Sequence, residues 1–268
     1  VTFFLNLDNC FMLVFEHIPK TAGTTLKFIL RNNFGISHCD VNLSRIDPFT
    51  QDDLRLTRKI FPSIKSISGH NLKEPTQHIN EDNALYITIL RDPVQRCVSH
   101  YQDNCLRHGN KLPFEKWILN TDMHNLQVKF IAGENNLEKA KKLITDKYFF
   151  VGLTERFNDS LRLLKAMLPY PLNINYKKKI VAKDNTIKKQ ILNNQQLVDL
   201  AKEYNRLDIE LYHYVAETLF PERWKAQSAH LEQTAPPENR YKTVWTWNYQ
   251  MSLFYNKFIY KIILKILG

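Results

Sequence analysis

Apolar residues gather along the chain into short runs, and each run is followed by a longer stretch with helical spacing of polar and apolar positions. Three runs are continuous and rich in β-branched or aromatic residues, over 11–15, 84–90 and 148–153, and a fourth over 63–68 alternates. Short runs bounded by turn residues are typical of buried strands in a parallel sheet. The order of elements therefore predicts an α/β fold in three layers, with a central, mostly parallel sheet flanked by helices.

Helix ends are marked by capping residues, by proline and by glycine. Asp92 can cap a helix that begins with Pro93, whereas Gly35 and Gly109 stand where a helix would end in a left-handed residue. The expected helices cover 24–34, 92–109, short stretches within 113–145, 154–168 and 193–219, the last as one long amphipathic helix.

The chain is predicted to consist of one domain over 1–225, a polar linker over 226–245 and a separate basic amphipathic helix over 246–268. A lysine recurs every fourth residue of that helix from Lys257 to Lys265, among aromatic and aliphatic residues. Such a helix suits peripheral contact with a membrane. It equally suits docking on its own domain or on a second subunit, and the sequence leaves these alternatives open.

The net charge indicates which partners the protein can bind, and the cysteine spacing limits the disulfides and zinc sites that it can form. The formal net charge of +10 favours an acidic partner such as a nucleic acid, a phosphorylated cofactor, an anionic polysaccharide or an anionic membrane. The four cysteines form neither a CxxC pair nor a zinc-binding spacing. Cys97 and Cys105 lie about 12 Å apart along one predicted helix, too far to form a disulfide. A disulfide between Cys10 and Cys39 and reduced, packed thiols both stay open.

Neither a secretory signal nor an apolar span of about 20 residues is visible, because polar residues at Asn6, Asp8 and Asn9 interrupt the apolar opening. We therefore expect a cytoplasmic protein, with membrane association through the C-terminal helix as an option. The Golgi lumen is the expected location if an upstream anchor has been removed.

The segment HIPKTAGTT, residues 17–25, joins the first strand to the first helix. Backbone N–H groups and the helix dipole favour an anion at such a point, Lys20 adds a full positive charge, and Gly23 lets the backbone approach closely. Hydroxyl donors are available at Thr21, Thr24 and Thr25. The lysine precedes the glycine, unlike in GxxxxGK[ST], so hydrolysis of ATP or GTP is disfavoured. An ordinary strand–helix turn is the alternative.

A second segment, LRDPVQRCVSHY over 90–101, also starts at the carboxyl end of a predicted strand. Arg91 lies at the turn, and Ser99 lies two turns into the following helix, so both can converge on a second anion. Two anion sites at neighbouring strand ends indicate a ligand with two separated phosphate groups.

Together and in this order, the two segments resemble motifs of sulfotransferases that use 3′-phosphoadenosine-5′-phosphosulfate (PAPS). HIPKTAGTT is similar to their 5′-phosphosulfate loop, and RDPxxRxxSxY is similar to their 3′-phosphate motif. The residues of both motifs are most similar to those of the carbohydrate-acting branch that includes the heparan and chondroitin uronyl 2-O-sulfotransferases. YFFVGLTERFNDSLRLLK (148–165) is similar to a third sequence block of that branch. The resemblance covers residues 11–215 in patches.

This resemblance implies a P-loop-like fold related to nucleotide kinases and no metal requirement. It also implies in-line transfer of the sulfuryl group from PAPS to a hydroxyl of a carbohydrate, as glycan or glycolipid, with 3′-phosphoadenosine 5′-phosphate (PAP) as product. The residues that it assigns to the 5′-phosphosulfate are Lys20, Thr21, Ala22, Gly23, Thr24 and Thr25. It assigns the 3′-phosphate to Arg91 and Ser99. The loop NINYKKK, with Tyr176, Lys177 and Lys178, stands where relatives have a loop that closes over the nucleotide; a solvated loop is the alternative.

Sulfuryl transfer needs positive charge at the leaving oxygen and a base for the acceptor hydroxyl. Lys20 is the candidate for the charge. His70 is the candidate for the base, because it follows a strand and a glycine, and relatives with a histidine base carry a comparable Gly-His turn. His17 is expected to pack beneath the anion loop, and His100 is expected to face elsewhere on its helix.

Other features give weaker expectations. Arg96, Gln127 and Lys129 could meet an anionic acceptor, and Arg96 could instead form a salt bridge with a neighbouring element. A P-loop-like nucleotide-dependent kinase and a non-catalytic polyanion-binding protein are the alternative functions. No recognisable RNA-binding pattern is present, so a nucleic acid is not expected as a partner.

Overall fold

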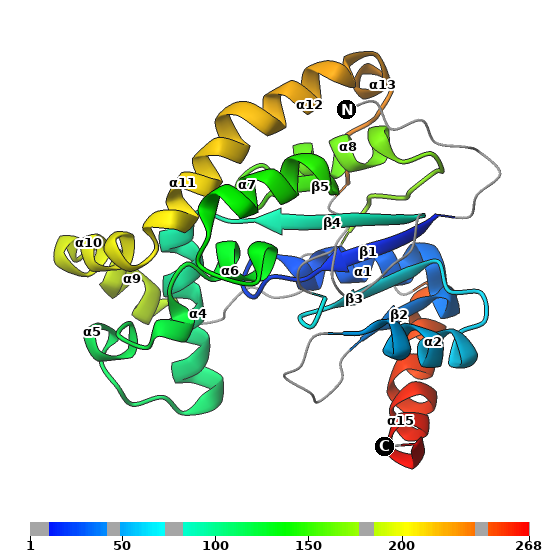
Figure 1. The fold of residues 1–268 in the computed structure, drawn as a ribbon, viewed down its shortest axis with the longest axis horizontal. Coiled ribbons are helices and arrows are strands. Elements are labelled where there is room, and N and C mark those ends of the chain that lie inside the picture. The colour runs from blue at the N-terminus through cyan, green and yellow to red at the C-terminus, as the bar shows by residue number, and fades with distance from the viewer. Residues whose placement is uncertain (1–10, 42–48, 73–82, 177–184, 239–245, 268) are drawn as a thin grey trace.

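Among the residues that the structure describes, five parallel strands form a central sheet (Figure 1). The computed structural model describes residues 11–41, 49–72, 83–176, 185–238 and 246–267, and the strands follow the order β2-β3-β1-β4-β5. Their bounds are β1 Met12–Glu16, β2 His38–Asp40, β3 Ser66–Gly69, β4 Ala84–Leu90 and β5 Tyr148–Leu153. Every residue of β1 is buried, which explains its continuous apolar run. The predicted α/β fold with a parallel sheet is confirmed.

Helices flank the sheet and extend from its carboxyl edge. Helix α1 packs on β2 and β3, α7 and α8 pack on β5, and α9 and α10 contact α4. The α-helices are α1 Gly23–Phe34, α2 Gln51–Ile60, α4 Pro93–His108, α5 Phe114–Trp117, α6 Leu126–Ala132, α7 Leu137–Asp146, α8 Phe157–Met167, α9 Thr186–Leu192, α10 Gln195–Tyr204, α11 Arg206–Tyr214, α12 Phe220–Ala226, α13 Ser228–Glu232, α14 Trp247–Phe254 and α15 Lys261–Leu267. Short 3-10 turns are η1 Gly35–Ser37 and η2 Thr121–Met123, and π-helical turns are η3 Val215–Leu219 and η4 Tyr255–Tyr260.

Strand β1 lies in the middle of the sheet, with β3 on one side and β4 on the other. The backbone N–H of His17 donates to the Gly69 carbonyl over 2.9 Å and so extends the β1–β3 pairing by one step. Strand β4 ends at Leu90, so Arg91 begins the next segment. The residues that follow these three strands, His17, His70 and Arg91, therefore start at the same carboxyl edge, where α/β sheets bind ligands.

Local capping signals placed two helices correctly. Oδ1 of Asp92 accepts a hydrogen bond from the Gln95 backbone over 2.8 Å, and Gly109 ends α4 in the left-handed conformation with φ of 66°. Gly35 follows α1 with φ of 55°. These predictions are confirmed because the capping interactions lie within a few residues of each helix end.

The prediction of one helix over 193–219 is wrong, because the helix is interrupted at Asn205 and resumes as α11, η3 and α12 up to Ala226. The Asn205 side chain donates to the Ala201 carbonyl over 2.9 Å and accepts from Arg96 over 3.4 Å. The side chain of Asn125, far away in sequence, accepts from the backbone of the first turn of α11. A cap supplied from another part of the chain leaves no local sequence signal.

The C-terminal helices dock on the domain rather than standing apart from it. The Phe28 and Tyr249 rings lie 4.9 Å apart between α1 and α14, and the Asn256 amide donates to the His38 carbonyl of β2 over 2.8 Å. The Tyr260 ring packs against Phe61 at 5.4 Å. Docking on its own domain, one of the alternatives left open by the sequence, is therefore what this segment does.

Part of the expected linker over 226–245 is also structured. Helix α13 lies within it, and the guanidinium of Arg162 donates to the carbonyls of Leu231 and Thr234 over 2.9 and 3.1 Å. Residues 239–245 lie outside the described residues, and the domain boundaries stay a prediction.

Two further expectations concern thiols and membranes. Cys39 carries a free thiol whose pKa is raised by burial, while Cys10 lies outside the described residues. Cys97 and Cys105 are also free. Among the helices that the structure describes, none is both long and apolar enough to cross a bilayer.

Candidate active site

The loop between β1 and α1 has an unusual backbone. Lys20 and Ala22 adopt left-handed φ values of 70° and 66°, on either side of Thr21. Residues other than glycine seldom adopt this conformation, and those that do collect at ligand-binding turns and anion-binding concavities. The Thr21 hydroxyl donates to the Ile18 carbonyl over 2.9 Å and closes the loop from inside. The site therefore has the backbone shape expected of an anion loop, with Thr24 half-buried and Thr25 buried in the first helical turn.

Gly23 is required by a close approach of His17. A Cβ atom added to Gly23 would lie 1.8 Å from Cδ2 and 2.0 Å from Nε2 of the His17 ring. The imidazole thus occupies the space that any other side chain at position 23 would need. His17 packs beneath the loop, as the sequence analysis expected.

The two sequence motifs meet at one point. Nη1 of Arg91 donates to the backbone carbonyl of Lys20 over 3.0 Å. The Gln127 side chain holds the Arg91 backbone at both its N–H and its C=O, each over 2.9 Å. Gln127 is itself buried, with its backbone N–H donating to Asp208 over 3.1 Å. Gln127 therefore supports Arg91 instead of meeting an acceptor.

One donor of Arg91 remains unused. Its buried Nε has no hydrogen-bond partner within the part of the chain that the structure describes. Burial lowers the pKa of the Arg91 guanidinium, although the nearby carboxylates of Glu155 and Asp92 counter this effect. Buried donors are rarely left unpaired, so an oxyanion beside Arg91 would complete its hydrogen bonding.

Three charged residues near the motifs were not expected from the sequence. The ammonium of Lys20 pairs with Oδ1 of Asp103 over 3.2 Å, and Asp103 also pairs with Arg107 over 3.1 Å. Lys188 on α9 has its backbone N–H hydrogen-bonded to Gln102 of α4. Burial lowers the pKa of Lys188, and the positive charge of Arg91 lowers it further.

Ser99, the partner proposed for Arg91, lies half-buried on α4. Tyr176 lies against the start of α8, where its hydroxyl donates to Asn158 over 2.8 Å and its ring meets Phe157 edge-on at 5.3 Å. These contacts do not connect Tyr176 with Lys20 or Arg91. Lys177 and Lys178 lie outside the described residues.

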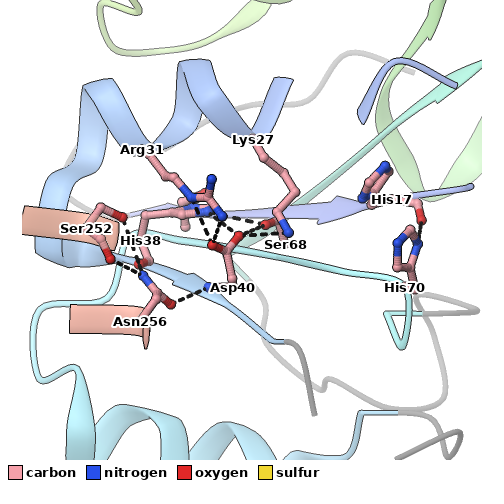
Figure 2. A network of polar contacts seen from close by, with 10 residues as sticks. His17, Lys27, Arg31, His38, Asp40, Ser68, His70, Ser252 and Asn256 are labelled. Atoms are coloured by element: carbon pink, nitrogen blue, oxygen red, sulfur yellow. Dashed lines mark hydrogen bonds and ion pairs between the residues drawn. The ribbon is translucent and has the colours of Figure 1, made fainter. Parts of the chain in front are cut away.

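His70 and His17 form a stacked pair, as Figure 2 shows. The ring centroids are 4.2 Å apart, and Nδ1 of His70 is hydrogen-bonded to the His17 backbone carbonyl. Since a carbonyl oxygen only accepts, Nδ1 must carry the hydrogen, and in the neutral ring Nε2 then holds the lone pair. This is the tautomer in which Nε2 can accept a proton.

The His17 ring differs from that of His70 in its surroundings. His70 is exposed, whereas His17 is buried and its Nδ1 has no hydrogen-bond partner among the described residues. Burial lowers the pKa of His17 well below its usual value, and the nearby charges of His70 and Lys27 lower it further. His17 therefore stays neutral beside His70.

Beyond this pair lies a buried cluster around Asp40, drawn in Figure 2. Its carboxylate accepts from Ser68 over 2.9 Å, pairs with Lys27 over 3.0 Å, and is bound by Arg31 and His38. Burial alone would raise the pKa of Asp40, but the hydrogen bond from His38 and the cations hold it well below its usual value. The cluster joins α1, β2 and β3, and β3 is the strand that ends just before His70.

The remaining candidates have structural roles. Arg96 is fully buried and donates to the Met123 carbonyl and to Asn205, so it cannot reach a surface acceptor. The Lys129 ammonium donates to the Thr121 carbonyl. His100 meets the Trp117 ring edge-on at 5.7 Å, and burial, followed by the charges of Arg96 and Lys20, lowers its pKa to about 4.

Comparison with known proteins agrees with this geometry. The model of the family described as "Sulfotransferase family" matches residues 4–256. Heparan sulfate 2-O-sulfotransferase 1 of Xenopus laevis is 24% identical over 212 residues, covering 62% of this chain and 57% of its own. The mouse protein of that name is 24% identical over 219 residues, with the same coverage. A heparan sulfate 2-O-sulfotransferase of Caenorhabditis elegans is 25% identical over 195 residues, covering 59% of this chain and 60% of its own.

These relatives correct one expectation and set one limit. The expected cytoplasmic location is wrong, because the heparan sulfate 2-O-sulfotransferases that the chain matches are Golgi enzymes. The chain spans between 57% and 60% of the length of these curated relatives. The match over residues 4–256, with which the parallel sheet is consistent, shows that the chain belongs to the sulfotransferase family of enzymes.

Proposed function

We propose that this chain transfers a sulfuryl group from PAPS to a hydroxyl group of a carbohydrate, with Lys20 and His70 as catalytic residues. The observation that carries the proposal is the hydrogen bond from the Arg91 guanidinium to the Lys20 carbonyl, because it brings the two motifs to one point. A nucleotide that carries anionic groups at its 5′ and 3′ positions matches two anion sites at neighbouring strand ends.

The residues present suit such a nucleotide. The left-handed turn at Lys20 and Ala22 and the first turn of α1 would hold the 5′-phosphosulfate. The unpartnered Nε of Arg91 would meet the 3′-phosphate together with the Ser99 hydroxyl. Lys188 of α9, whose backbone is hydrogen-bonded to Gln102 of α4 and whose pKa is lowered by the Arg91 charge, would add a third cation.

When bound, PAPS supplies an activated sulfuryl group and a leaving nucleotide on which negative charge develops. Lys20 stabilises this charge through its ammonium group, which the loop carries beside the start of α1. To do so the ammonium must exchange Asp103 for the ligand, since the two are paired over 3.2 Å.

His70 takes the proton of the acceptor hydroxyl at Nε2. Its Nδ1–H stays on the His17 carbonyl throughout, which fixes the direction of the ring. The neutral His17 ring stacks on His70 without the repulsion that a second imidazolium would cause. The pair thus lets His70 become positively charged when it accepts the proton.

The acceptor class follows from the relatives, which are named for heparan sulfate. We infer a polysaccharide with acidic sugars as the acceptor, in keeping with the net charge of +10.

The proposal is tested by nucleotide binding and by transfer. We expect PAP to raise the melting temperature of the protein while ATP and GTP do not, and sulfate from labelled PAPS to appear on a desulfated heparan-type polysaccharide. Lys20→Ala should lower turnover at least about 100-fold, whereas Lys142→Ala, an exposed lysine on α7, should leave it unchanged. His70→Ala should abolish transfer and keep the PAP-dependent shift.

The alternatives predict other results. Stabilisation by ATP but not by PAP would support a kinase. Binding of the polysaccharide without any effect of PAP would support a non-catalytic polyanion-binding protein. Full transfer activity of Lys20→Ala would refute the assignment of the loop.

A further inference from the structure

The outer face of the C-terminal helices is strongly apolar. Among the described residues, nine large hydrophobic side chains are exposed, and five of them belong to 246–267. These five are Trp247, Phe254, Phe258, Ile262 and Ile266, with 76% and 75% of the first and last exposed. Single exposed apolar residues are common on protein surfaces, but such a concentration on one short segment marks an interaction surface.

Four of these five residues form one stripe. Phe254, Phe258, Ile262 and Ile266 recur every fourth residue, and the rings of Phe254 and Phe258 pack at 5.3 Å. The opposite face is buried against the domain through Tyr249, Ser252, Asn256 and Tyr260. Figure 1 shows α15 projecting from the body of the domain beyond β2 and α2. The stripe is therefore free along a helix whose other side is already docked.

Positive charge accompanies the stripe. Lys257 and Lys261 are exposed, and the Lys257 ammonium lies 5.6 Å from the centre of the Phe258 ring. The sequence after Glu238 contains the five basic residues Arg240, Lys242, Lys257, Lys261 and Lys265 and no acidic residue. The surface thus offers apolar side chains and cations together.

We propose that this face inserts into the interfacial layer of a lipid bilayer, with the lysines on anionic headgroups. Apolar insertion combined with lysine–headgroup attraction is how amphipathic helices bind membranes, and tryptophan prefers the same layer. A second copy of the chain suits the face less well. A symmetric contact would bring Lys257 and Lys261 of both copies together, and this segment has no carboxylate to pair with them.

Docking of the inner face gives the contact a definite orientation. Asn256 accepts a hydrogen bond from the Asp40 backbone over 2.7 Å and donates to the His38 carbonyl, so the helix is fixed to β2. A bilayer on the outer face would therefore hold the β2 side of the sheet towards the lipid. This inference does not depend on the reaction proposed above.

Flotation of the purified chain with vesicles tests the proposal. Wild type is expected to float with vesicles of phosphatidylcholine and phosphatidylserine, and less with phosphatidylcholine alone or in high salt. Replacing Phe254→Asp and Phe258→Asp together should lower the bound fraction at least tenfold. The control is Leu106→Asp with Leu119→Asp, two residues of similar exposure outside the C-terminal helices, and this variant should bind as wild type does.

Folding of both double variants is checked by circular dichroism and by the melting temperature without ligand. Equal binding of the two double variants would overturn the proposal, as would failure of wild type to bind either vesicle. A wild-type oligomer that the Phe254→Asp and Phe258→Asp variant converts to monomer, without any vesicle binding, would show that a second copy covers the face.

Discussion

Replacing Gly23 by alanine tests how the anion loop and the histidine pair depend on each other. In a helix, alanine is favoured over glycine by about 0.5–1 kcal/mol, so this change would stabilise the protein if space were available. The added Cβ would instead lie 1.8 Å from Cδ2 of His17. Since carbon atoms prefer about 3.5 Å, the ring would have to move by about 1.7 Å.

The His17 ring cannot move by this distance without disturbing the residues packed around it. The His17 ring stacks on Phe15 at 5.5 Å and on His70 at 4.2 Å, and its backbone carbonyl holds Nδ1 of His70. Overpacking of this kind costs about 1–3 kcal/mol of the free energy of unfolding. A displacement of about 1 Å in a reacting group can lower the rate about 100-fold. We therefore expect Gly23→Ala to melt at a lower temperature and to lose about 100-fold in turnover.

The assay is transfer of labelled sulfate, measured beside urea unfolding. Gly109→Ala is the control, because it has φ of 66° but no atom within 4 Å of the added Cβ. It should cost about 1–2 kcal/mol through backbone strain and leave turnover unchanged. In a His17→Ala background the space is open, so Gly23→Ala should lower turnover no more than about threefold. Independent effects of the two substitutions, or full activity of Gly23→Ala, would refute the reasoning.

Three further changes test the charges around the site. Asp40→Asn leaves Lys27 and Arg31 without their buried counter-ion and should lower the free energy of unfolding, measured in urea, by about 3–5 kcal/mol. The same change at the exposed Asp52 should lower it by less than about 0.5 kcal/mol. The folded state lowers the pKa of Asp40, so the difference in unfolding free energy between wild type and Asp40→Asn should be complete above the unfolded pKa of about 3.9. It should shrink as the pH falls towards the folded pKa. A difference under about 1 kcal/mol at pH 7 would contradict the assignment. Burial lowers the pKa of His100 to about 4, below its unfolded value, so protonation of His100 favours unfolding. Wild type should therefore lose about 3 kcal/mol more unfolding free energy between pH 6.5 and pH 4 than His100→Phe does. Identical pH profiles of the two proteins would count against this role. Lys188→Ala should weaken PAP binding about tenfold in calorimetry, while the exposed neighbour Lys189→Ala should not; equal affinities would remove Lys188 from the site.

Sequence reasoning succeeded where the signal is local. The strands over 84–90 and 148–153 and the helix from Pro93 to His108 follow from apolar runs and caps a few residues long. Parallel pairing of β1 with β3, in which Glu16 lies opposite Gly69, brings His17 beside His70. Both histidines were named from the sequence, but their contact needed the strand register.

Features that depend on distant parts of the chain were not predictable in this way. Asn125 caps α11 across more than 80 positions, which is why the interruption at Asn205 left no local pattern. Asp40 gathers partners from α1 and β3, and Lys188, on a helix nearly 100 positions after Arg91, has its pKa lowered by the Arg91 charge. A single carboxylate or lysine at such positions looks like an ordinary surface residue until the fold supplies its neighbours.

The pairing of Lys20 with Asp103 leads to one more prediction. Both side chains are about one-fifth exposed, and a pair in this setting contributes about 0.5–1 kcal/mol. An anion that binds to Lys20 must break this pair and approach the Asp103 charge. Asp103→Asn should therefore tighten PAP binding about two- to fivefold in calorimetry, with the largest gain at low salt. Asp146→Asn, an exposed carboxylate on α7, should change nothing. Weaker binding by Asp103→Asn would mean instead that Asp103 holds Lys20 in the position that the ligand needs.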